Sequence, residues 1–150
     1  MHIEVRHGEF TLSDDPDRLD FSAIHHFLSN SYWGRQRPRE SLRKGISNSF
    51  CFGMYRGRDQ VGFARVITDY ATFGYLADVY ILEPYRRQGL GSWMVNHILS
   101  HPRLKDLRRW ALVTEDAQEL YRRCGFTELQ FPKQHMQRLQ PYPATSPHVA

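Results

Sequence analysis

The chain has 150 residues, of which 41% are hydrophobic and 13% aromatic, and its formal net charge is +4. This length suits one domain with one core, and the apolar content excludes a generally disordered chain. The chain has no run of 18 apolar residues, which a membrane-spanning helix would need, and its first residues lack the apolar core of a signal peptide. We therefore expect a cytoplasmic protein. The two cysteines, Cys51 and Cys124, form no Cys-x-x-Cys pair and are expected to be reduced.

The N-terminal third is predicted to be mainly helical. Residues 1–9 are polar and expected to be loosely held, and a short strand is expected at 10–13. Apolar residues then recur at helical spacing, which predicts an amphipathic helix over about 20–31. A basic loop leads to a second, shorter helix at 39–46.

Three strands follow, at 50–55, 60–68 and 73–82, and their short connections predict an antiparallel meander. Side chains alternate between the two faces of a strand. For the third strand this alternation predicts one face with Tyr75, Val79 and Ile81 and another with Leu76, Asp78 and Tyr80.

The C-terminal half is predicted to alternate helices and strands. A helix should run from Gly91 to about Ser100, and an apolar strand at 110–114 should follow it. Because a crossover helix separates them, 110–114 should pair in parallel with the strand at 73–82.

A last helix at 116–124 should end at Gly125, which suits a helix C-terminus. A final strand is expected to begin at 126–129 and to continue at 136–139. We expect one domain over 1–140 and a disordered, proline-rich tail over 141–150.

A glycine-containing loop joins the third strand to the helix behind it. It reads Arg-x-x-Gly-x-Gly, with Arg86, Gly89 and Gly91 at the defined positions. The first turn of a helix has N–H groups without internal partners and a partial positive charge, so such a loop can bind a pyrophosphate. A dinucleotide fingerprint would need a third glycine where Met94 stands, and a Walker A loop would need Gly-Lys-Ser/Thr, so both are excluded.

A second motif lies about 30 residues further on. It runs from Ala117 to Phe126 and reads Ala-x-x-Leu-Tyr-x-x-x-Gly-Phe. With the glycine loop, it resembles the GNAT superfamily (Gcn5-related N-acetyltransferases), and the order of elements extends the resemblance over about 10–139. The resemblance implies an α/β (α+β) GNAT fold. This fold has a mixed sheet of six to seven strands, an antiparallel N-terminal meander, a splayed parallel pair 73–82/110–114 and about four flanking helices.

The resemblance also implies which residues bind acetyl-CoA. Backbone groups of the third strand would contact pantetheine and the thioester, and the loop would hold the pyrophosphate. Thr114 stands where many members have an asparagine, and Tyr121 would lie near the sulfur. The implied cofactor-binding residues are Val79, Tyr80, Ile81, Arg86, Arg87, Gln88, Gly89, Leu90, Gly91, Ser92, Thr114 and Tyr121.

The implied reaction needs a proton acceptor for the amine and a donor for the leaving thiolate. Tyr121 is the candidate acid. Asp78 is the candidate base because a carboxylate inside an apolar strand is seldom left unpaired; the alternative is that it pairs with an arginine or caps a loop. Asp69 is a turn residue, for which a structural role is the favoured interpretation.

The first helix borders the acceptor pocket in this family. Tyr32 and Trp33 at the end of this helix are therefore candidate substrate residues, and Asp69 and Phe73, from the turn before the third strand and from its start, are further candidates. His97 and His101 have a spacing that can hold a metal, but no third ligand is evident, so no metal site is predicted.

We therefore expect direct transfer of an acetyl group from acetyl-CoA to a primary amine of a small molecule or peptide. The alternative is a non-catalytic GNAT-like module that senses CoA or binds an anionic partner. Between residues 86 and 123, eight Lys/Arg face four Asp/Glu. This basic excess suits CoA, whereas nucleic acid and membrane are not expected as partners and a homodimer is possible from the family.

Overall fold

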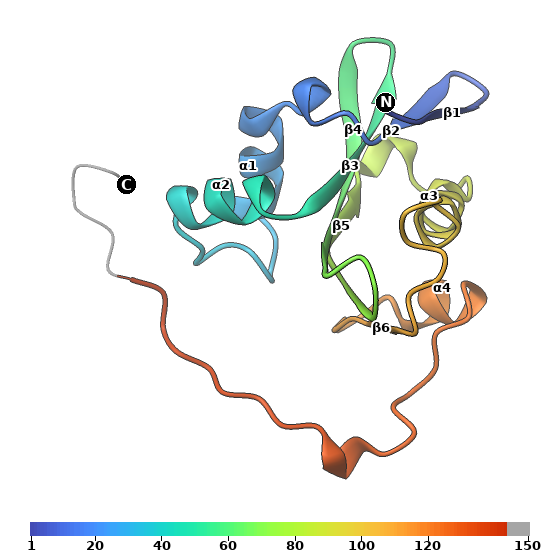
Figure 1. The fold of residues 1–150 in the computed structure, drawn as a ribbon. Coiled ribbons are helices and arrows are strands. Elements are labelled where there is room, and N and C mark those ends of the chain that lie inside the picture. The colour runs from blue at the N-terminus through green and yellow to red at the C-terminus, as the bar shows by residue number, and fades with distance from the viewer. Residues whose placement is uncertain (144–150) are drawn as a thin grey trace.

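The computed structural model describes residues 1–143 (Figure 1). Its centre is one sheet of six strands arranged in chain order, with antiparallel pairing throughout except for the last pair. The strands are β1 (Glu4–His7), β2 (Phe10–Ser13), β3 (Phe50–Arg56), β4 (Asp59–Thr68), β5 (Phe73–Ile81) and β6 (Arg109–Ala111). The predicted mixed sheet, with its antiparallel meander and parallel last pair, is confirmed.

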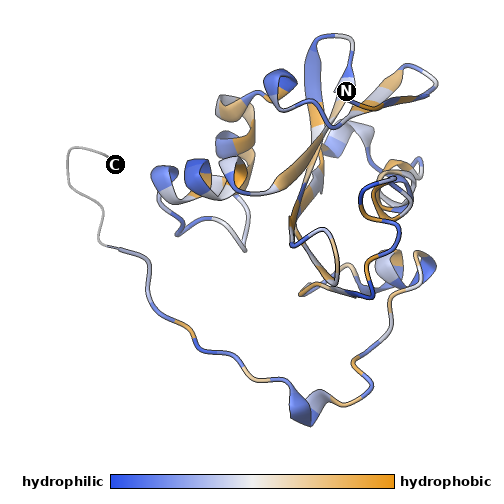
Figure 2. Ribbon diagram, in the orientation of Figure 1, coloured by the Kyte–Doolittle hydropathy of each residue, from blue (hydrophilic) through white to orange (hydrophobic). Residues whose placement is uncertain are grey.

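Two helices cover each face of the sheet. On one side lie α1 (Phe21–Ser29) and α2 (Arg39–Ser47), and on the other α3 (Leu90–Leu99) and α4 (Gln118–Arg123) (Figure 1). Apolar residues concentrate on the strands and the inner helix faces (Figure 2). No helix within residues 1–143 is both long and apolar enough to cross a membrane.

The first nine residues are more ordered than the sequence suggested. β1 pairs along its length with β2, although only Val5 is partly buried. Asp14 fixes the start of this hairpin, because its carboxylate accepts from the backbone N–H of Ile3 at 2.8 Å. The same carboxylate lies 2.8 Å from Nε2 of His101, and Nδ1 of that ring accepts from the Arg103 N–H. The Nε2–H therefore donates to Asp14 and ties the hairpin to the end of α3.

A bulge interrupts β5 and changes which way its side chains point. Phe63 pairs with Tyr80 and Arg65 with Ala77, so Asp78 and Val79 together oppose one residue of β4. Regular alternation therefore fails across the bulge, and Leu76 packs toward α3 whereas Tyr80 packs among α1 and α2. The prediction that these two side chains share a face was wrong.

β6 pairs along its whole length with only the first three residues of β5. Their register covers three pairs, Phe73 with Arg109, Gly74 with Trp110 and Tyr75 with Ala111. β6 is shorter than the predicted 110–114, and the chain then turns away toward α4. The rest of β5 thus has no strand on that side, and the two strands splay.

The chain after Phe126 leaves the folded body. No strand forms at 126–129 or 136–139, so that expectation was wrong for the described structure. The segment instead runs beneath β6 and across to the side of α1 and α2 (Figure 1), with one short 3-10 turn at Pro132–Gln134. The predicted disorder of the tail beyond residue 143 lies outside the described residues.

Candidate active site

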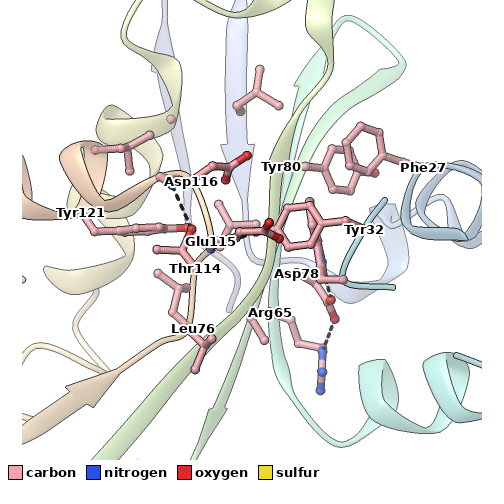
Figure 3. Close-up of a pocket in the computed structure, with 18 of the residues that line it drawn as sticks. Phe27, Tyr32, Arg65, Leu76, Asp78, Tyr80, Thr114, Glu115, Asp116 and Tyr121 are labelled. Atoms are coloured by element: carbon pink, nitrogen blue, oxygen red, sulfur yellow. Dashed lines mark hydrogen bonds and ion pairs between the residues drawn. The ribbon is translucent and has the colours of Figure 1, made fainter. Parts of the chain in front are cut away.

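A cleft of about 1400 Å³ lies where β5 and β6 separate. Its floor is the unpaired part of β5, and its walls come from the loop after α1, the loop between β6 and α4, and the start of α3. Figure 3 shows side chains from both halves of the molecule pointing into it. Of the predicted cofactor-binding residues, all line the cleft except Gln88, namely Val79, Tyr80, Ile81, Arg86, Arg87, Gly89, Leu90, Gly91, Ser92, Thr114 and Tyr121.

One end of the cleft is the N-terminus of α3. The loop before it has two residues in the left-handed region, Arg87 at φ 64° and Gly89 at φ 79°. A turn with such residues can direct neighbouring N–H groups toward one point and so form an anion-binding concavity. The first α3 hydrogen bond is from Trp93 N–H to the Gly89 carbonyl, so the N–H groups of Leu90 to Ser92 have no described helix partner.

The two glycines of the loop serve different purposes. Gly89 needs its positive φ, and a Cβ there would meet nothing within 4 Å, so the space beside it is open. Gly91 has ordinary helical backbone, but a Cβ there would lie 2.9 Å from Cδ1 of Leu120. Gly89 therefore shapes the concavity, while Gly91 allows α4 to pack closely on α3.

Three arginines, Arg86, Arg87 and Arg123, line this end of the cleft. The Nε–H of Arg86 donates to the Ile81 carbonyl at 2.7 Å, which fixes the loop to the end of β5. Gln88 lies outside the lining and donates to the Tyr85 carbonyl at 3.0 Å. The positive end of the cleft thus combines helix N–H groups with guanidinium groups.

Tyr121 and Thr114 lie in the middle of the cleft wall (Figure 3). The Thr114 hydroxyl accepts from the Ala117 N–H at 3.1 Å and so caps the approach to α4. Burial raises the pKa of Tyr121 to about 12, so its hydroxyl is protonated at neutral pH and available as a donor. Its ring packs edge-on against Phe126, which fixes its direction.

Asp78 lies at the other end of the cleft, and both oxygens of its carboxylate accept hydrogen bonds. Its side chain is 2% exposed and accepts two hydrogen bonds from Arg37, each 2.7 Å, one from Arg65 at 2.9 Å and one from Trp33 Nε1 at 3.1 Å. Burial alone would raise the pKa of Asp78, but the two guanidiniums outweigh it and hold the pKa below its usual value. A carboxylate with a lowered pKa accepts a proton poorly. The contacts of Asp78 therefore match the alternative to a catalytic base, in which it pairs with arginine.

Tyr32 and Trp33, two of the candidate substrate residues, line this second end of the cleft. The Tyr32 hydroxyl accepts from the Glu115 N–H at 3.1 Å, which joins the loop after α1 to the loop before α4 across the cleft. Between Tyr32 and Tyr121, Figure 3 shows the carboxylates of Glu115 and Asp116. Neither carboxylate has an ion-pair partner among residues 1–143.

Two predicted substrate residues, Asp69 and Phe73, are not brought into the cleft. Asp69 closes the turn between β4 and β5 by accepting from the backbone N–H groups of Ala71, Thr72 and Phe73. These hydrogen bonds and the Thr72 hydroxyl lower the pKa of Asp69. Its position therefore fits the structural role that the sequence favoured.

Several cleft residues were missed at the sequence level. They are Arg37, Arg65, Glu115, Asp116 and Tyr142. A buried carboxylate in an apolar strand requires cationic partners, so Asp78 itself was the available signal for the two arginines. Tyr142 lies near Arg37 and comes from the segment expected to be a disordered tail.

The family follows from this fold and from sequence comparison. Residues 21–126 match the Acetyltransferase (GNAT) family, and this range covers both motifs and every residue that lines the cleft except Tyr142. The chain therefore belongs to the GNAT acetyltransferase family.

Individual relatives agree with this assignment. A Gibberella zeae protein, FG08082, whose name describes it as a putative acetyltransferase, is 36% identical over 136 residues, and the alignment covers 76% of each chain. A Xanthomonas campestris crystal structure, described as a putative acetyltransferase of the GNAT family, is 40% identical with a TM-score of 0.84, covering 91% of this chain and 96% of that chain. A Staphylococcus aureus structure, SA2161, shares the fold at 22% identity and a TM-score of 0.69, covering 87% and 98%.

Proposed function

We propose that the protein transfers the acetyl group of acetyl-CoA directly to a primary amine. The observation that carries this proposal is one continuous cleft, with the helix N-terminus of α3 at one end and two carboxylates without ion-pair partners between Tyr121 and the second end. Phosphate groups suit the helix N-terminus, and an ammonium group suits the two carboxylates. The reacting groups would meet between them, beside Tyr121.

The residues at the positive end fit a CoA diphosphate. The N–H groups of Leu90 to Ser92 lack described partners, the space beside Gly89 is open, and Arg87 and Arg123 add charge. Backbone groups of β5 beyond Tyr75 face the cleft without a strand partner and can receive the amide-containing pantetheine arm. Acetyl-CoA supplies an activated acyl group when bound there.

The chain's own groups would then guide the transfer. An amine with a pKa near about 10 must lose a proton before it attacks. Because Asp78 is held by two guanidiniums, Glu115 and Asp116 are better placed to accept that proton, directly or through water. An N–H near Val79 can stabilise charge on the acyl oxygen, and the Tyr121 hydroxyl can donate a hydrogen bond to the departing sulfur.

The test is calorimetric titration with acetyl-CoA, followed by an amine panel with detection of released thiol. We expect saturable binding and thiol release that depends on the amine. A Glu115→Gln and Asp116→Asn pair should lower turnover with the best amine while acetyl-CoA still binds. Absence of binding at millimolar acetyl-CoA would overturn the proposal.

The non-catalytic alternative, a module that senses CoA, makes a different prediction. It requires acetyl-CoA binding without thiol release for any amine in the panel. The protonated Tyr121 in the cleft wall favours the enzyme, because ligand sensing alone gives no reason to place a donor there.

A further inference from the structure

The second end of the cleft carries more positive than negative charge. Two guanidinium groups, those of Arg37 and Arg65, line it and share a single carboxylate, that of Asp78. The three side chains are 12%, 14% and 2% exposed, so water screens their charges poorly. Two cations beside one anion leave one positive charge uncompensated at this end.

No other side chain among residues 1–143 supplies the compensating negative charge. Within this part of the chain, Asp78 is the one acidic residue that forms an ion pair with either arginine. Burial raises the pKa of Cys51, which lies near Arg65, to about 12, so its thiol is uncharged at neutral pH. Tyr142, which lies near Arg37, contributes a phenol rather than an anion. Because an uncompensated cation away from water is costly, this end of the cleft favours an anionic ligand.

The same end also has donors that the described chain does not use. Arg65 donates from Nε to Asp78 at 2.9 Å and from Nη1 to the Ser49 hydroxyl at 3.1 Å, whereas its Nη2 group donates to no residue of 1–143. Ser41, in the first turn of α2, lines the cleft, and its hydroxyl makes no hydrogen bond within those residues. A guanidinium and a hydroxyl are suitable donors to a carboxylate.

These two donors lie on neighbouring surfaces. Gly45 is one turn beyond Ser41 on α2, and residues four apart share a helix face. A Cβ at Gly45 would lie 3.3 Å from Nη1 of Arg65, so this face of α2 is directed at the guanidinium. Ser41 and Arg65 can therefore contact one bound group together.

The charge reverses toward the middle of the cleft. Glu115 and Asp116, which come from the loop before α4, lie beside Tyr121, whereas Arg65 and Asp78 lie on the side of α1 and α2 (Figure 3). A ligand that follows this order would place a cationic group near the acetyl carbon and an anionic group farther out. A molecule with both an amine and a carboxylate has these two groups.

We propose that the acceptor is an amino acid, in which a free carboxylate accompanies the amine that is acetylated. Its carboxylate binds Arg65 and the Ser41 hydroxyl, and its ammonium group faces Glu115 and Asp116. In the transfer the amine nitrogen replaces sulfur on the acetyl carbon, one ammonium proton passing to Glu115 or Asp116 and a second to the departing thiolate. The acceptor's carboxylate changes no bond. This inference rests on the proposed function, since it assigns the substrate class of the same cleft.

The kinetic test compares acceptors that differ only in the carboxylate. Full-length protein with saturating acetyl-CoA is assayed for thiol release with the common L-α-amino acids, β-alanine and 4-aminobutyrate, each beside its own carboxamide. The best amino acid should exceed its carboxamide in kcat/KM by about 10- to 100-fold, the range for hydrogen bonds to a charged group.

Two variants test the residues that bind the carboxylate. Arg65→Gln leaves Asp78 paired with Arg37 and removes the surplus charge, so the preference for the amino acid over its carboxamide should fall about 10-fold or more. Activity with the carboxamide should be kept, whereas general damage to the fold would lower both activities alike. Ser41→Ala, at a helix position that alanine suits, should lower the same preference about 10-fold and decides the matter if Arg65→Gln does not fold.

Matched controls remove the same groups elsewhere. Arg58→Gln removes one positive charge from the exposed turn between β3 and β4, and Ser47→Ala removes a hydroxyl from the exposed end of α2. Neither residue lines the cleft, so both variants should keep the preference of the wild type. Loss of the preference in the controls would contradict the assignment to Arg65 and Ser41.

A binding measurement separates this inference from the transferase itself. N-acetylglycine and N-acetylglycinamide need no turnover to bind, and the NMR signals of the Arg37 and Arg65 Nε–H groups should shift with the first compound only. Equal use of amino acids and carboxamides would leave the transferase standing and overturn the inference. If no amine releases thiol, the proposed function fails; arginine signals that shift would still support the carboxylate site, and signals that do not move would overturn it as well.

Discussion

Asp78 has two structural roles: it adopts a left-handed backbone conformation, and its carboxylate pairs with two arginines that line the cleft. Its φ of 56° is uncommon for a residue with a side chain, and aspartate and asparagine tolerate it better than most. The carboxylate is then directed toward Arg37 and Arg65, whose side chains are 12% and 14% exposed. Those two largely buried cations depend on it for neutralisation.

Asp78→Asn should therefore destabilise the fold without changing its shape. Asparagine keeps the size and the left-handed backbone but leaves both guanidiniums without a counter-charge, which costs about 3 kcal/mol. Urea unfolding should show this loss. Glu40→Gln is the control, because Glu40 is 74% exposed in its pair with Arg43, and removing that pair should change stability by less than about 1 kcal/mol.

The same contacts set a pH dependence. The pKa of Asp78 is lowered in the folded state, so its stabilisation is present above the unfolded value of about 3.9 and is lost as pH falls through the folded value. In acid unfolding, the wild type should lose this contribution only below about pH 4. The difference in stability between wild type and Asp78→Asn should shrink over the same range; a constant difference would contradict the assignment.

Tyr121→Phe tests the proposed donor. The substitution keeps the ring packed on Phe126 and removes only the hydroxyl. Turnover should fall on the order of 10²-fold, while the Kd of acetyl-CoA should change little. Because a thiol has a pKa near about 8.5 and Tyr121 about 12, the hydroxyl should act chiefly as a hydrogen-bond donor to the sulfur. Unchanged turnover would remove Tyr121 from the mechanism.

At the level of single residues, sequence reasoning found the groups that local motifs specify. The loop residues and Tyr121 belong to short patterns, and the structure brings them to one cleft. It missed Arg37 and Arg65, because their role depends on a partner 41 and 13 residues away. It also named Asp69 as a substrate candidate, whereas the hydrogen bonds of the turn show the structural role that its position had already favoured.

Among the elements, Gly89 in the loop before α3 has a matched control in Gly57, which lies in the turn between β3 and β4. Gly89 and Gly57 both have positive φ, 79° and 60°, and a Cβ at either would meet nothing within 4 Å. Gly89→Glu and Gly57→Glu should therefore cost similar stability, about 1–2 kcal/mol. Only Gly89→Glu places a negative charge beside the helix N-terminus.

Titration should separate the two variants. Gly57→Glu should bind acetyl-CoA like the wild type, whereas Gly89→Glu should lose detectable binding. Equal binding by both variants would show that the α3 N-terminus does not hold the diphosphate.

Most elements could be predicted from apolar spacing, since α1, α2 and the meander are strongly patterned. β1 was missed because a polar edge strand lacks a clear alternation of apolar and polar residues. It is held in place by β2 and Asp14. The faces of β5 were misassigned because a bulge at Asp78 depends on its pairing with β4. The strand expected at 126–129 has the right pattern but no partner within the described chain.

For the whole molecule, charge should govern cofactor affinity. The net charge is +4, and Arg86, Arg87 and Arg123 line the end proposed for the diphosphate. Raising the ionic strength from about 0.01 M to about 0.15 M shortens the screening length from about 30 Å to about 8 Å. The Kd of acetyl-CoA should rise several-fold over this range. Acetyl-pantetheine, which lacks the phosphates, should show no such dependence.

The two helical layers must also keep their spacing for the cleft to exist. The hydrogen bond from the Glu115 N–H to Tyr32 spans the gap between them, and β5 lies beneath it. Helices α1 and α2 and the loop between them line the end proposed for the acceptor, whereas α3 and α4 line the end proposed for the phosphates and supply Tyr121. Both sides therefore depend on the same splayed pair of strands.

The bulge in β5 leaves that strand one residue longer than its β4 partner requires. A chain shortened by one residue at Asp78 or Val79 could pair continuously, and its sheet would gain regularity. The shortening would leave Tyr80 opposite Phe63, but it would remove either the carboxylate that pairs with Arg37 and Arg65 or the backbone at Val79 that the acyl chain is proposed to meet. At this position, a change that makes the sheet more regular would therefore disfavour the proposed catalysis.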